Sequence, residues 1–326
     1  MCTSIIFSPA DHYFGRNLDL EISFGQQVVI TPRKYEFKFK NMPSLKNHNA
    51  IVGIAMVADG YPLYFDASNE KGLGMAGLNY NGNAHYFPVT DEDKDNIASF
   101  EFIPWILGQC GTVAEAKNLL SRINITNLNF KPEMQASPLH WLLADKTGAS
   151  VVIESDADGL HVYDNPVGVL TNNPKFPLQL FNLNNYSNVS SAEPKNGFSK
   201  DVDFNLYSRE MGSRDLPGGA DSASRFVRAT FNKFNAPVSD DNNKNIDTYF
   251  HILHSVEQQK GVDQVGPGKF EYTIYSSGTN LDTSDFYYTT YENKRINHID
   301  IHKEDLTASD LITFPMLDQV TINDQN

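Results

Sequence analysis

Short apolar segments of strand length, each bounded by turn residues, fill roughly the first 80 residues of the chain. TSIIFS, HYFGRNLDL and QQVVITPRKY are separated by PAD and SFG, and the pattern continues through AIVGIAMVADGYPLYFDASNEKGLGMAGLNY with turns at ADG and NEKG. This succession predicts a predominantly β N-terminal third, in which Cys2 lies at the start of the first strand.

Two pairs of helices are predicted between further groups of strands. SFEFIPWILGQC has Ser99 as its expected N-cap and Pro104 near its first turn, and TVAEAKNLL carries a capping box of Thr112 and Glu115. Later helices are expected in SASRFVRATFNKFN and NIDTYFHILHSVEQQ, and later strands in PLHWLLADKTGASVVIES, GLHVYDNPVGVLTNN, KFEYTIYSS, DFYYTTYEN and HIDIHK. The order predicts one α+β domain over residues 1–326, with sheets flanked by helices.

The net charge of −14, from 26 basic and 40 acidic residues, argues against nucleic acid and anionic membrane surfaces as partners. The N-terminus shows no basic and apolar leader, and no run approaches about 18 apolar residues, so we expect neither secretion nor stable membrane association. Cys2 and Cys110 form no disulfide framework, which fits a reducing, cytoplasmic location. Cys110 lies in an apolar helical segment and is expected to be buried.

The stretch from Phe181 to Gly219 has a different composition from the rest of the chain. It is rich in Asn, Ser, Gly and Pro and contains LNNYSNVSSAEPKNGFS. Long segments of weak structure are usually functional, mediate assembly or are mobile. Residues 187–215 are therefore a candidate assembly arm, with a mobile surface loop as the alternative.

Cys2 directly follows the initiator position, so removal of Met1 would give one residue both a thiol and a free α-amine. A thiolate attacks carbonyl carbon, and an α-amine accepts a proton near neutral pH, so together they supply nucleophile and base without a histidine. If Met1 is retained, that amine is an amide and is not a base. A cysteine at position 2 can equally be incidental, and its position alone does not decide.

Six motifs accompany Cys2 along essentially the whole chain. They are MCTSIIFSPADHYFGRNLDLEISF, YFDASNEKGLGMAGLNY, PLHWLLADKTG, GVLTNNPKFPLQLFNLNNY, SASRFVRATF and YSSGTNLDTSDFYYTTYEN. Together they resemble the choloylglycine hydrolase family, which comprises bile salt hydrolases and penicillin V acylases. The resemblance implies an N-terminal-nucleophile amidase with a four-layer α/β/β/α sandwich, two antiparallel sheets lying between helices, and no metal or organic cofactor.

The resemblance assigns Cys2 as the nucleophile and FGRNLD as the next part of the site. Arg16 beside the sulfur would favour the thiolate, and Asp19 would orient the α-amine. Residues 16 and 19 have opposite parity in a regular strand, so we expect a bend or bulge that lets both face Cys2. Without the resemblance, a surface Arg–Asp pair is the simpler interpretation.

The same resemblance assigns two oxyanion donors, Asn79 in GLNY and Asn172 in VLTNNP, with Asn173 as a weaker candidate. TNNP alone is just as readily a turn. SRFVR contains two arginines, and the spacing from Asn172 favours Arg225 for the site and leaves Arg228 as a structural ion-pair partner. Asparagine at position 79 resembles bile salt hydrolases, whereas penicillin V acylases more often have tyrosine there.

The implied reaction is hydrolysis of glycine- or taurine-conjugated bile salts through a thioester on Cys2. A steroid body requires an apolar pocket, and Leu18, Phe24 and Phe130 are the expected lining residues, although each also suits ordinary packing. Because family members commonly form tetramers, the resemblance also implies a homotetramer joined through residues 187–215.

Two alternatives remain at this stage. The first is a penicillin V acylase or another N-acyl amidase that uses the same nucleophile. The second is a binding protein that retains Met1 and holds an amphipathic ligand without turnover. HILH and HIDIH have spacings that can bind metal, but the first lacks a third ligand and the second resembles a solvated strand edge, so we expect no metal site.

Overall fold

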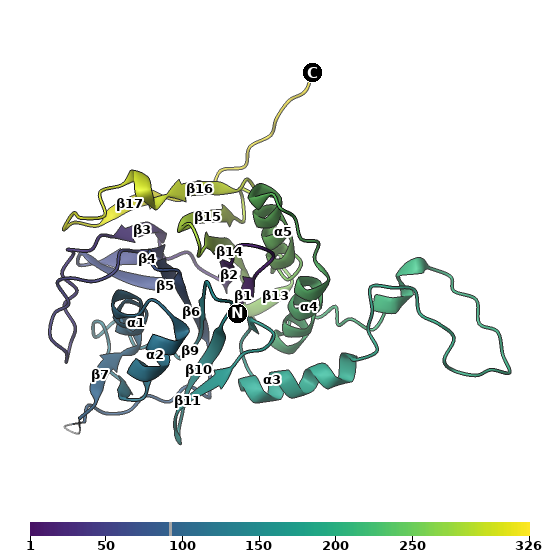
Figure 1. The fold of residues 1–326 in the computed structure, drawn as a ribbon, viewed down its shortest axis with the longest axis horizontal. Coiled ribbons are helices and arrows are strands. Elements are labelled where there is room, and N and C mark those ends of the chain that lie inside the picture. The colour runs from purple at the N-terminus through teal and green to yellow at the C-terminus, as the bar shows by residue number, and fades with distance from the viewer. Residues whose placement is uncertain (91–92) are drawn as a thin grey trace.

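The computed structural model describes residues 1–90 and 93–326, and two antiparallel sheets form its centre (Figure 1). In the first sheet, the first two strands of the chain lie side by side. In spatial order its members are β12 (Val169–Leu170), β1 (Cys2–Phe7), β2 (Tyr13–Leu20), β14 (Lys269–Asn280), β15 (Asp285–Thr290) and β16 (Asn297–Asp300), with β13 (Asp263–Gly266) beside β14.

The second sheet lies against the first and has its own spatial order. Its members are β11 (Gly159–Asp164), β10 (Ser150–Asp156), β9 (Leu139–Asp145), β6 (Leu73–Asn79), β5 (Tyr61–Asn69), β4 (Ile51–Ala58), β3 (Gln27–Thr31) and β17 (Ile312–Pro315). A separate parallel pair is formed by β7 (Asp95–Ala98) and β8 (Ile123–Thr126). Both large sheets combine strands from the beginning and the end of the chain, as in the pairing of β2 with β14 and of β3 with β17.

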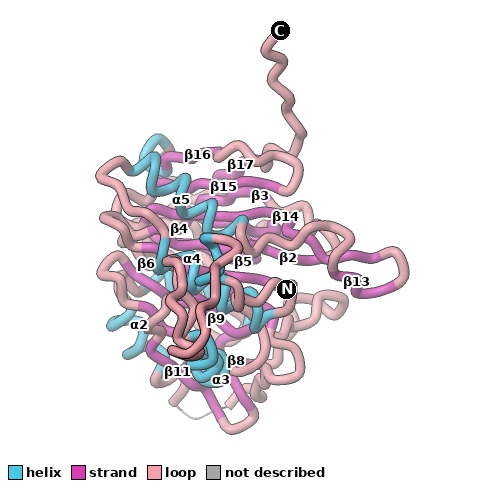
Figure 2. Tube along the Cα trace, turned by 90° about the vertical axis from the view of Figure 1, so that its right-hand side faces the viewer, coloured by secondary structure: helices cyan, strands magenta, loops and turns pink. Residues whose placement is uncertain are grey.

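Helices cover the outer face of each sheet (Figures 1 and 2). α1 (Phe102–Gln109) packs on β5 and β6, and α2 (Val113–Leu120) packs on β9. α4 (Ser222–Asn235) packs on β1, and α5 (Asn242–His254) packs on β14 and β2. Because β1 and β2 also contact β6, the layers run helix, sheet, sheet, helix. The predicted α+β class and the four-layer α/β/β/α sandwich are therefore confirmed.

Two hydrophobic clusters follow these layers. The larger lies between the sheets and under α4 and α5, and it includes Phe14, Leu78 and Leu142. The smaller lies between the second sheet and α1 and α2, with Trp105 and Trp141 among its members. Because each sheet is covered on both faces, all six residues of β1 are buried, which places Cys2 inside the molecule rather than on its surface.

The helix starts follow the local signals only in part. Thr112 caps α2, since its hydroxyl accepts the Glu115 N–H at 3.2 Å, as the capping box predicts. Ser99 was expected to cap α1 but lies inside a 3-10 turn, Ser99–Glu101, that precedes the helix. Glu101 occupies the N-cap position of α1, and its carboxylate accepts the Ala98 N–H at 3.0 Å, a hydrogen bond that caps the 3-10 turn rather than α1.

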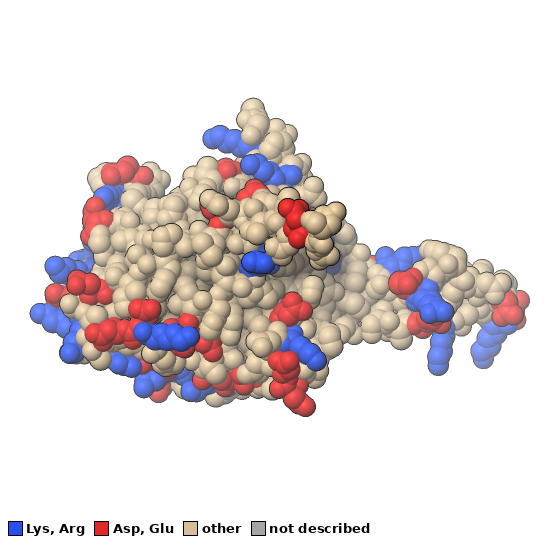
Figure 3. All heavy atoms as spheres, turned by 90° about the horizontal axis from the view of Figure 1, so that it is seen from above, with Lys and Arg blue, Asp and Glu red and all other residues tan. Residues whose placement is uncertain are grey.

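The Asn- and Ser-rich stretch leaves the body of the molecule after α3 (Phe176–Asn182) and returns to it at α4 (Figure 1). Short 3-10 turns at Leu183–Tyr186 and Arg209–Ser213 are its regular elements. Acidic and basic side chains both occur along this projecting segment (Figure 3). Across the described ranges, no helix has the length and apolar character needed to cross a membrane.

Candidate active site

Cys2 opens β1 and is paired in register with Leu18 of β2. Only 2% of Cys2 is exposed to solvent. Cys2 therefore lies at the centre of the sandwich, with the second sheet on one side of β1 and α4 on the other. Cys110 is also buried, as its apolar context predicted.

The strand β2 supplies groups to both sides of Cys2 by ordinary alternation. Arg16 reaches main-chain oxygens of the second sheet, whereas Asn17 donates to the Leu253 carbonyl of α5 and Asp19 approaches Arg225 of α4. The bend or bulge that was expected to let both Arg16 and Asp19 face Cys2 does not lie in β2, so the two side chains leave this strand on opposite faces. The register does shift at this point, but the extra residue belongs to β14, opposite residues 18 and 19.

Arg16 is fixed between the two sheets with its guanidinium on the sulfur. Its Nη2 donates to Cys2 Sγ, and its Nη1 donates to the carbonyls of Gly77 and, at 3.2 Å, Phe65. Phe65 is the unpaired residue of a bulge in β5, which turns its carbonyl toward the other sheet. Burial alone would lower the pKa of Arg16, but Cys2 and the buried groups around it raise that pKa above its usual value.

Asp66 is a buried carboxylate near this arginine that the sequence analysis did not single out. It accepts hydrogen bonds from the Tyr275 hydroxyl at 2.5 Å and the Ser277 hydroxyl at 2.7 Å. Burial raises the pKa of Asp66, while the charge on Arg16 opposes that rise. The available sequence signal was an aspartate inside the otherwise apolar strand YPLYFDAS.

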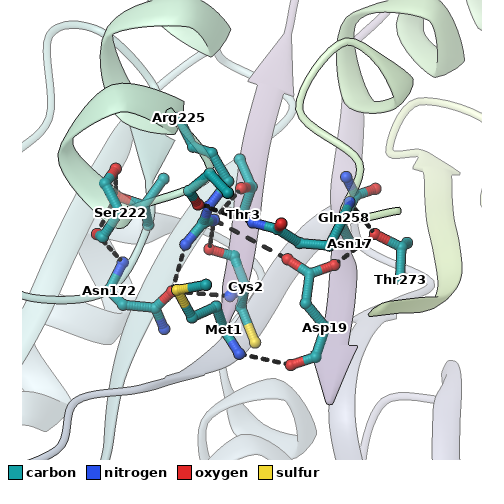
Figure 4. Close-up of polar contacts among 12 residues, drawn as sticks. Met1, Cys2, Thr3, Asn17, Asp19, Asn172, Ser222, Arg225, Gln258 and Thr273 are labelled. Atoms are coloured by element: carbon teal, nitrogen blue, oxygen red, sulfur yellow. Dashed lines mark hydrogen bonds and ion pairs between the residues drawn. The ribbon is translucent and has the colours of Figure 1, made fainter. Parts of the chain in front are cut away.

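Arg225 serves the other side of Cys2, and Figure 4 shows it reaching from α4 toward the first strand. Its Nη1 donates to the Cys2 carbonyl at 2.5 Å and to the Thr3 hydroxyl at 2.6 Å, and its Nη2 donates to Asn172 Oδ1 at 2.9 Å. Burial lowers the pKa of Arg225, and the carboxylate of Asp19 counteracts this. Arg228 lies outside the cluster, where it donates to two carbonyls of the preceding loop.

Asp19 is fully buried, and one of its oxygens lacks a hydrogen-bond donor among the described residues. Oδ1 accepts from the Thr273 hydroxyl at 2.6 Å, whereas Oδ2 faces Arg225 Nη1 at 3.9 Å (Figure 4). Burial raises the pKa of Asp19, although Arg225 and the chain terminus oppose this. The Met1 ammonium donates to the Asp19 carbonyl at 2.6 Å and pairs with Glu271 at 2.8 Å.

Asn172 connects the main chain of Cys2 to the end of β6. Its Oδ1 accepts the Cys2 N–H at 2.7 Å, and its Nδ2 donates to the main-chain carbonyl of Asn79 at 2.7 Å. Asn79 thus contacts the cluster through its backbone. Asn173, the weaker candidate, points elsewhere and donates to the Asn81 carbonyl at 2.5 Å.

The expected pocket residues occupy three different positions. Leu18 is buried opposite Cys2, and the Phe24 ring lies 5.7 Å from that of Phe65, whose carbonyl Arg16 contacts. Phe130 belongs to a separate aromatic group and lies 5.3 Å from Phe100, in a pocket that both rings line. The first two are therefore linked to the Cys2 cluster by contacts, whereas no contact seen between described residues links Phe130 to it.

Other clusters of possible metal ligands have partners of their own. Asp156, Asp158 and His161 bring ligand atoms close together, but Lys175 already pairs with Asp156 at 2.6 Å. In HILH, the second histidine, His254, contacts the Thr289 hydroxyl at 3.1 Å. None of these groups contacts the Cys2 cluster through an interaction seen between described residues.

The fold and the buried N-terminal cysteine together define the class of N-terminal-nucleophile amidases. Residues 2–314 match the model of the linear amide C–N hydrolases, choloylglycine hydrolase family. The chain belongs to this family, and the resemblance inferred from its motifs is confirmed.

Several relatives match nearly the whole chain. A bile salt hydrolase/transferase of Lactiplantibacillus plantarum is 51% identical over 97% of each chain, and one of Clostridium perfringens is 34% identical over the full length of both. A crystal structure of a variant of conjugated bile acid hydrolase from Clostridium perfringens superposes with a TM-score of 0.92 at 34% identity, covering all of both chains. Penicillin V acylase from Agrobacterium tumefaciens shares the fold, with a TM-score of 0.78 at 20% identity over 99% of this chain and 94% of the acylase.

Proposed function

We propose that the protein hydrolyses the amide bond of glycine- or taurine-conjugated bile salts, with Cys2 as the nucleophile. The observation that carries this proposal is the cluster around Cys2, in which Arg16 donates to the sulfur and Asn172 accepts from the nitrogen at 2.7 Å. The choice of substrate rests on the relatives that bear this activity in their names and match the full length of the chain.

The proposed active form lacks Met1. Its removal turns the Cys2 N–H into an α-amine that retains Asn172 Oδ1 as its neighbour at 2.7 Å. The free oxygen of Asp19 supports a role for that residue in receiving and orienting the new amine. Arg225 holds both the Cys2 carbonyl and Asn172, so it keeps the amine and its acceptor in a fixed relation.

Acylation begins when the Cys2 thiolate, stabilised by the Arg16 guanidinium, attacks the amide carbon. The C–N bond then breaks, the amine leaves with a proton from the Cys2 α-ammonium, and a thioester remains. Water, deprotonated by the same α-amine, attacks the thioester and releases the bile acid and the thiol. No metal or organic cofactor enters these steps.

Asn79 and Asn172 are the proposed donors to the oxyanion that forms in both steps. Asn172 Nδ2 uses one of its two hydrogens on the Asn79 carbonyl, which leaves the second for the oxyanion. The Asn79 side chain would complete the pair from the end of β6. Removing one such donor typically costs about 10²–10³ in kcat.

Leu18 and Phe24 are the proposed contacts for the steroid body, with Phe130 as a more distant wall. Leu18 lies opposite Cys2, so an apolar side chain beside the thiol suits the hydrocarbon part of a bile salt, and the conjugated end then lies toward the polar Cys2 cluster. We place the enzyme in the cytoplasm because two free, buried cysteines fit a reducing compartment.

The test is the release of glycine and taurine from conjugated bile salts by purified protein whose intact mass shows loss of Met1. A Cys2→Ser variant is the matched control and should release neither. If processed protein releases no amine from bile salts but hydrolyses phenoxymethyl penicillin, the bile salt assignment fails and the acylase alternative replaces it. Retention of Met1 together with ligand binding would support the non-catalytic alternative.

We also propose that residues 187–215 join subunits of a homotetramer, with residues 1–326 acting as one catalytic domain. The segment exposes large apolar side chains that a monomer leaves in water, since Phe198 is 88% and Tyr207 is 78% exposed. The molar mass measured by light scattering as the protein elutes from a size-exclusion column tests this assembly. Phe198→Ser is the variant, and Phe181→Ser, on the neighbouring helix, is the control. A monomeric wild type would contradict the assembly, and an unchanged mass for Phe198→Ser would remove that side chain from it.

A further inference from the structure

A buried histidine and glutamate lie behind the segment that carries Asn172. His140 of β9 and Glu154 of β10 both have 0% of their surface exposed. His140 Nε2 is 2.9 Å from the Thr171 carbonyl oxygen, and its Nδ1 is 3.1 Å from Glu154 Oε1. The same glutamate oxygen accepts the Phe176 N–H at 3.0 Å.

These contacts fix where the protons are. A carbonyl oxygen only accepts hydrogen bonds, so His140 Nε2 must carry a hydrogen toward Thr171. With a neutral imidazole and an ionised Glu154, two lone pairs would then face each other at 3.1 Å. The pair therefore holds one further proton between Nδ1 and the carboxyl group, and this proton keeps Nε2 as a donor.

The donor acts on the residue directly before Asn172. The Thr171 carbonyl is held by His140, while the Asn172 N–H donates to the Ser222 hydroxyl at 2.8 Å. The backbone on both sides of the Asn172 Cα is thereby anchored. The side chain that accepts from the Cys2 nitrogen has little freedom to move as long as these anchors persist.

Other titratable groups enclose the pair. The Tyr80 ring stacks on His140 with centroids 4.4 Å apart and planes inclined by 6°. Its hydroxyl donates to Asp156 at 3.1 Å, and Asp156 in turn pairs with Lys175 at 2.6 Å. The Asp156 charge is thus balanced locally, and Glu154 is the acidic group that faces His140.

We propose that His140 and Glu154 are positioning residues, which hold the Thr171 carbonyl and thereby keep Asn172 in place for the reaction at Cys2. This inference rests on the proposed function. The wild-type rate on conjugated bile salts tests that function. The ratio of variant to wild-type rate tests the pair, and it can be measured on any amide that the wild type cleaves.

Glu154→Gln is the decisive variant because it keeps the shape and changes the proton. The glutamine oxygen must still face the Phe176 N–H, so its carbonyl also faces His140 Nδ1. A neutral His140 then carries its hydrogen on Nδ1, and Nε2 turns a lone pair toward the Thr171 carbonyl. Only a doubly protonated His140 restores that hydrogen bond.

We expect Glu154→Gln to lower kcat by about 10- to 100-fold at pH 7.5, with KM within about threefold of wild type, because a small displacement of a reacting group costs on this scale. The ratio to wild type should rise as the pH is lowered from about 7.5 to about 5.5, because a second proton on His140 restores the hydrogen bond from its Nε2 to the Thr171 carbonyl. A loss that is constant across this range, or no loss, would overturn the proposal. So would failure of this isosteric variant to fold.

Two further variants separate positioning from general damage. His140→Phe keeps the stack on Tyr80 but has no donor, so its loss of kcat should not depend on pH. Tyr80→Phe keeps the ring and should stay within about threefold of wild type. In both, the rate at which iodoacetamide modifies Cys2 should stay within about twofold of wild type, because Arg16 contacts the sulfur independently of this pair. If the iodoacetamide rate of His140→Phe fell by the same factor as its kcat, His140 would have a merely structural role and the inference would be overturned.

Discussion

Replacing Arg225 with methionine tests whether the helix side of Cys2 is organised by one side chain. The guanidinium is fully buried and makes hydrogen bonds in several directions. Its acceptors are the Cys2 carbonyl, the Thr3 hydroxyl, Asn172 Oδ1 and the Ala220 carbonyl. Methionine fills much of the same volume but donates to none of them, so the substitution removes the hydrogen bonds while disturbing the packing little.

The cost has two overlapping parts. Each buried acceptor that loses its donor costs about 1–3 kcal/mol. Removing Arg225 also leaves its buried ion-pair partner Asp19 without a cation, and breaking such a pair costs about 3–5 kcal/mol. Because the acceptors can relax and share other donors, we expect a fall of about 3–5 kcal/mol in the free energy of unfolding. Against a total stability of about 5–15 kcal/mol, this loss leaves the variant mostly folded at 25 °C except at the lower end of that range.

Urea unfolding followed by tryptophan fluorescence measures this change, and amine release in the absence of urea measures the effect on catalysis. Arg228→Met is the matched control, because Arg228 lies on the same helix and, among the described residues, donates to two loop carbonyls, of which that of Gly219 is exposed. We expect it to cost about 1 kcal/mol or less. Equal costs for the two variants, or a loss below about 1 kcal/mol for Arg225→Met, would refute the reasoning.

Three further predictions follow from burial. Gly15→Ala should destabilise the protein by about 1–3 kcal/mol, measured by urea unfolding, because a methyl group there collides with the Ser277 carbonyl. Burial lowers the pKa of His254 to about 4, so its contribution is complete above about pH 6.5 and is lost as the pH falls to about 4; the free energy of unfolding should drop by up to about 3 kcal/mol in that range, and less in His254→Gln. Burial raises the pKa of Cys110 to about 11, so peptide mapping after iodoacetamide treatment of processed protein at pH 8 should find Cys2 modified at least about tenfold faster.

Local patterns were sufficient for the order of elements but not for every boundary. Alternating and fully apolar segments predicted the strands, and Thr112 with Glu115 predicted the start of α2. Ser99 does not cap α1 because the chain enters this helix through the turn Ser99–Glu101, which places Glu101 at the N-cap position. The Glu101 carboxylate also accepts the Lys40 N–H at 2.6 Å, a contact between distant segments that local patterns do not reveal.

The candidate site shows the same division. The motifs identified Cys2 and the residues expected around it, but sequence alone gave no distance between them. Asp66 and the His140–Glu154 pair were missed because their importance lies in contacts across the sheets. PLHWLL contains the histidine, yet nothing local distinguishes a histidine held between a carbonyl and a carboxylate from one that simply fills the core.

The opposite orientations of Arg16 and Asp19 give FGRNLD a simple physical basis. Strand alternation sends position 16 to the second sheet, where the Cys2 sulfur lies, and position 19 to the helix layer, beside Arg225. A nucleophile that is also its own base needs two different surroundings for one residue: a cation at the thiol and acceptors at the amine. A strand in the centre of a four-layer sandwich supplies both, because its two faces border different layers.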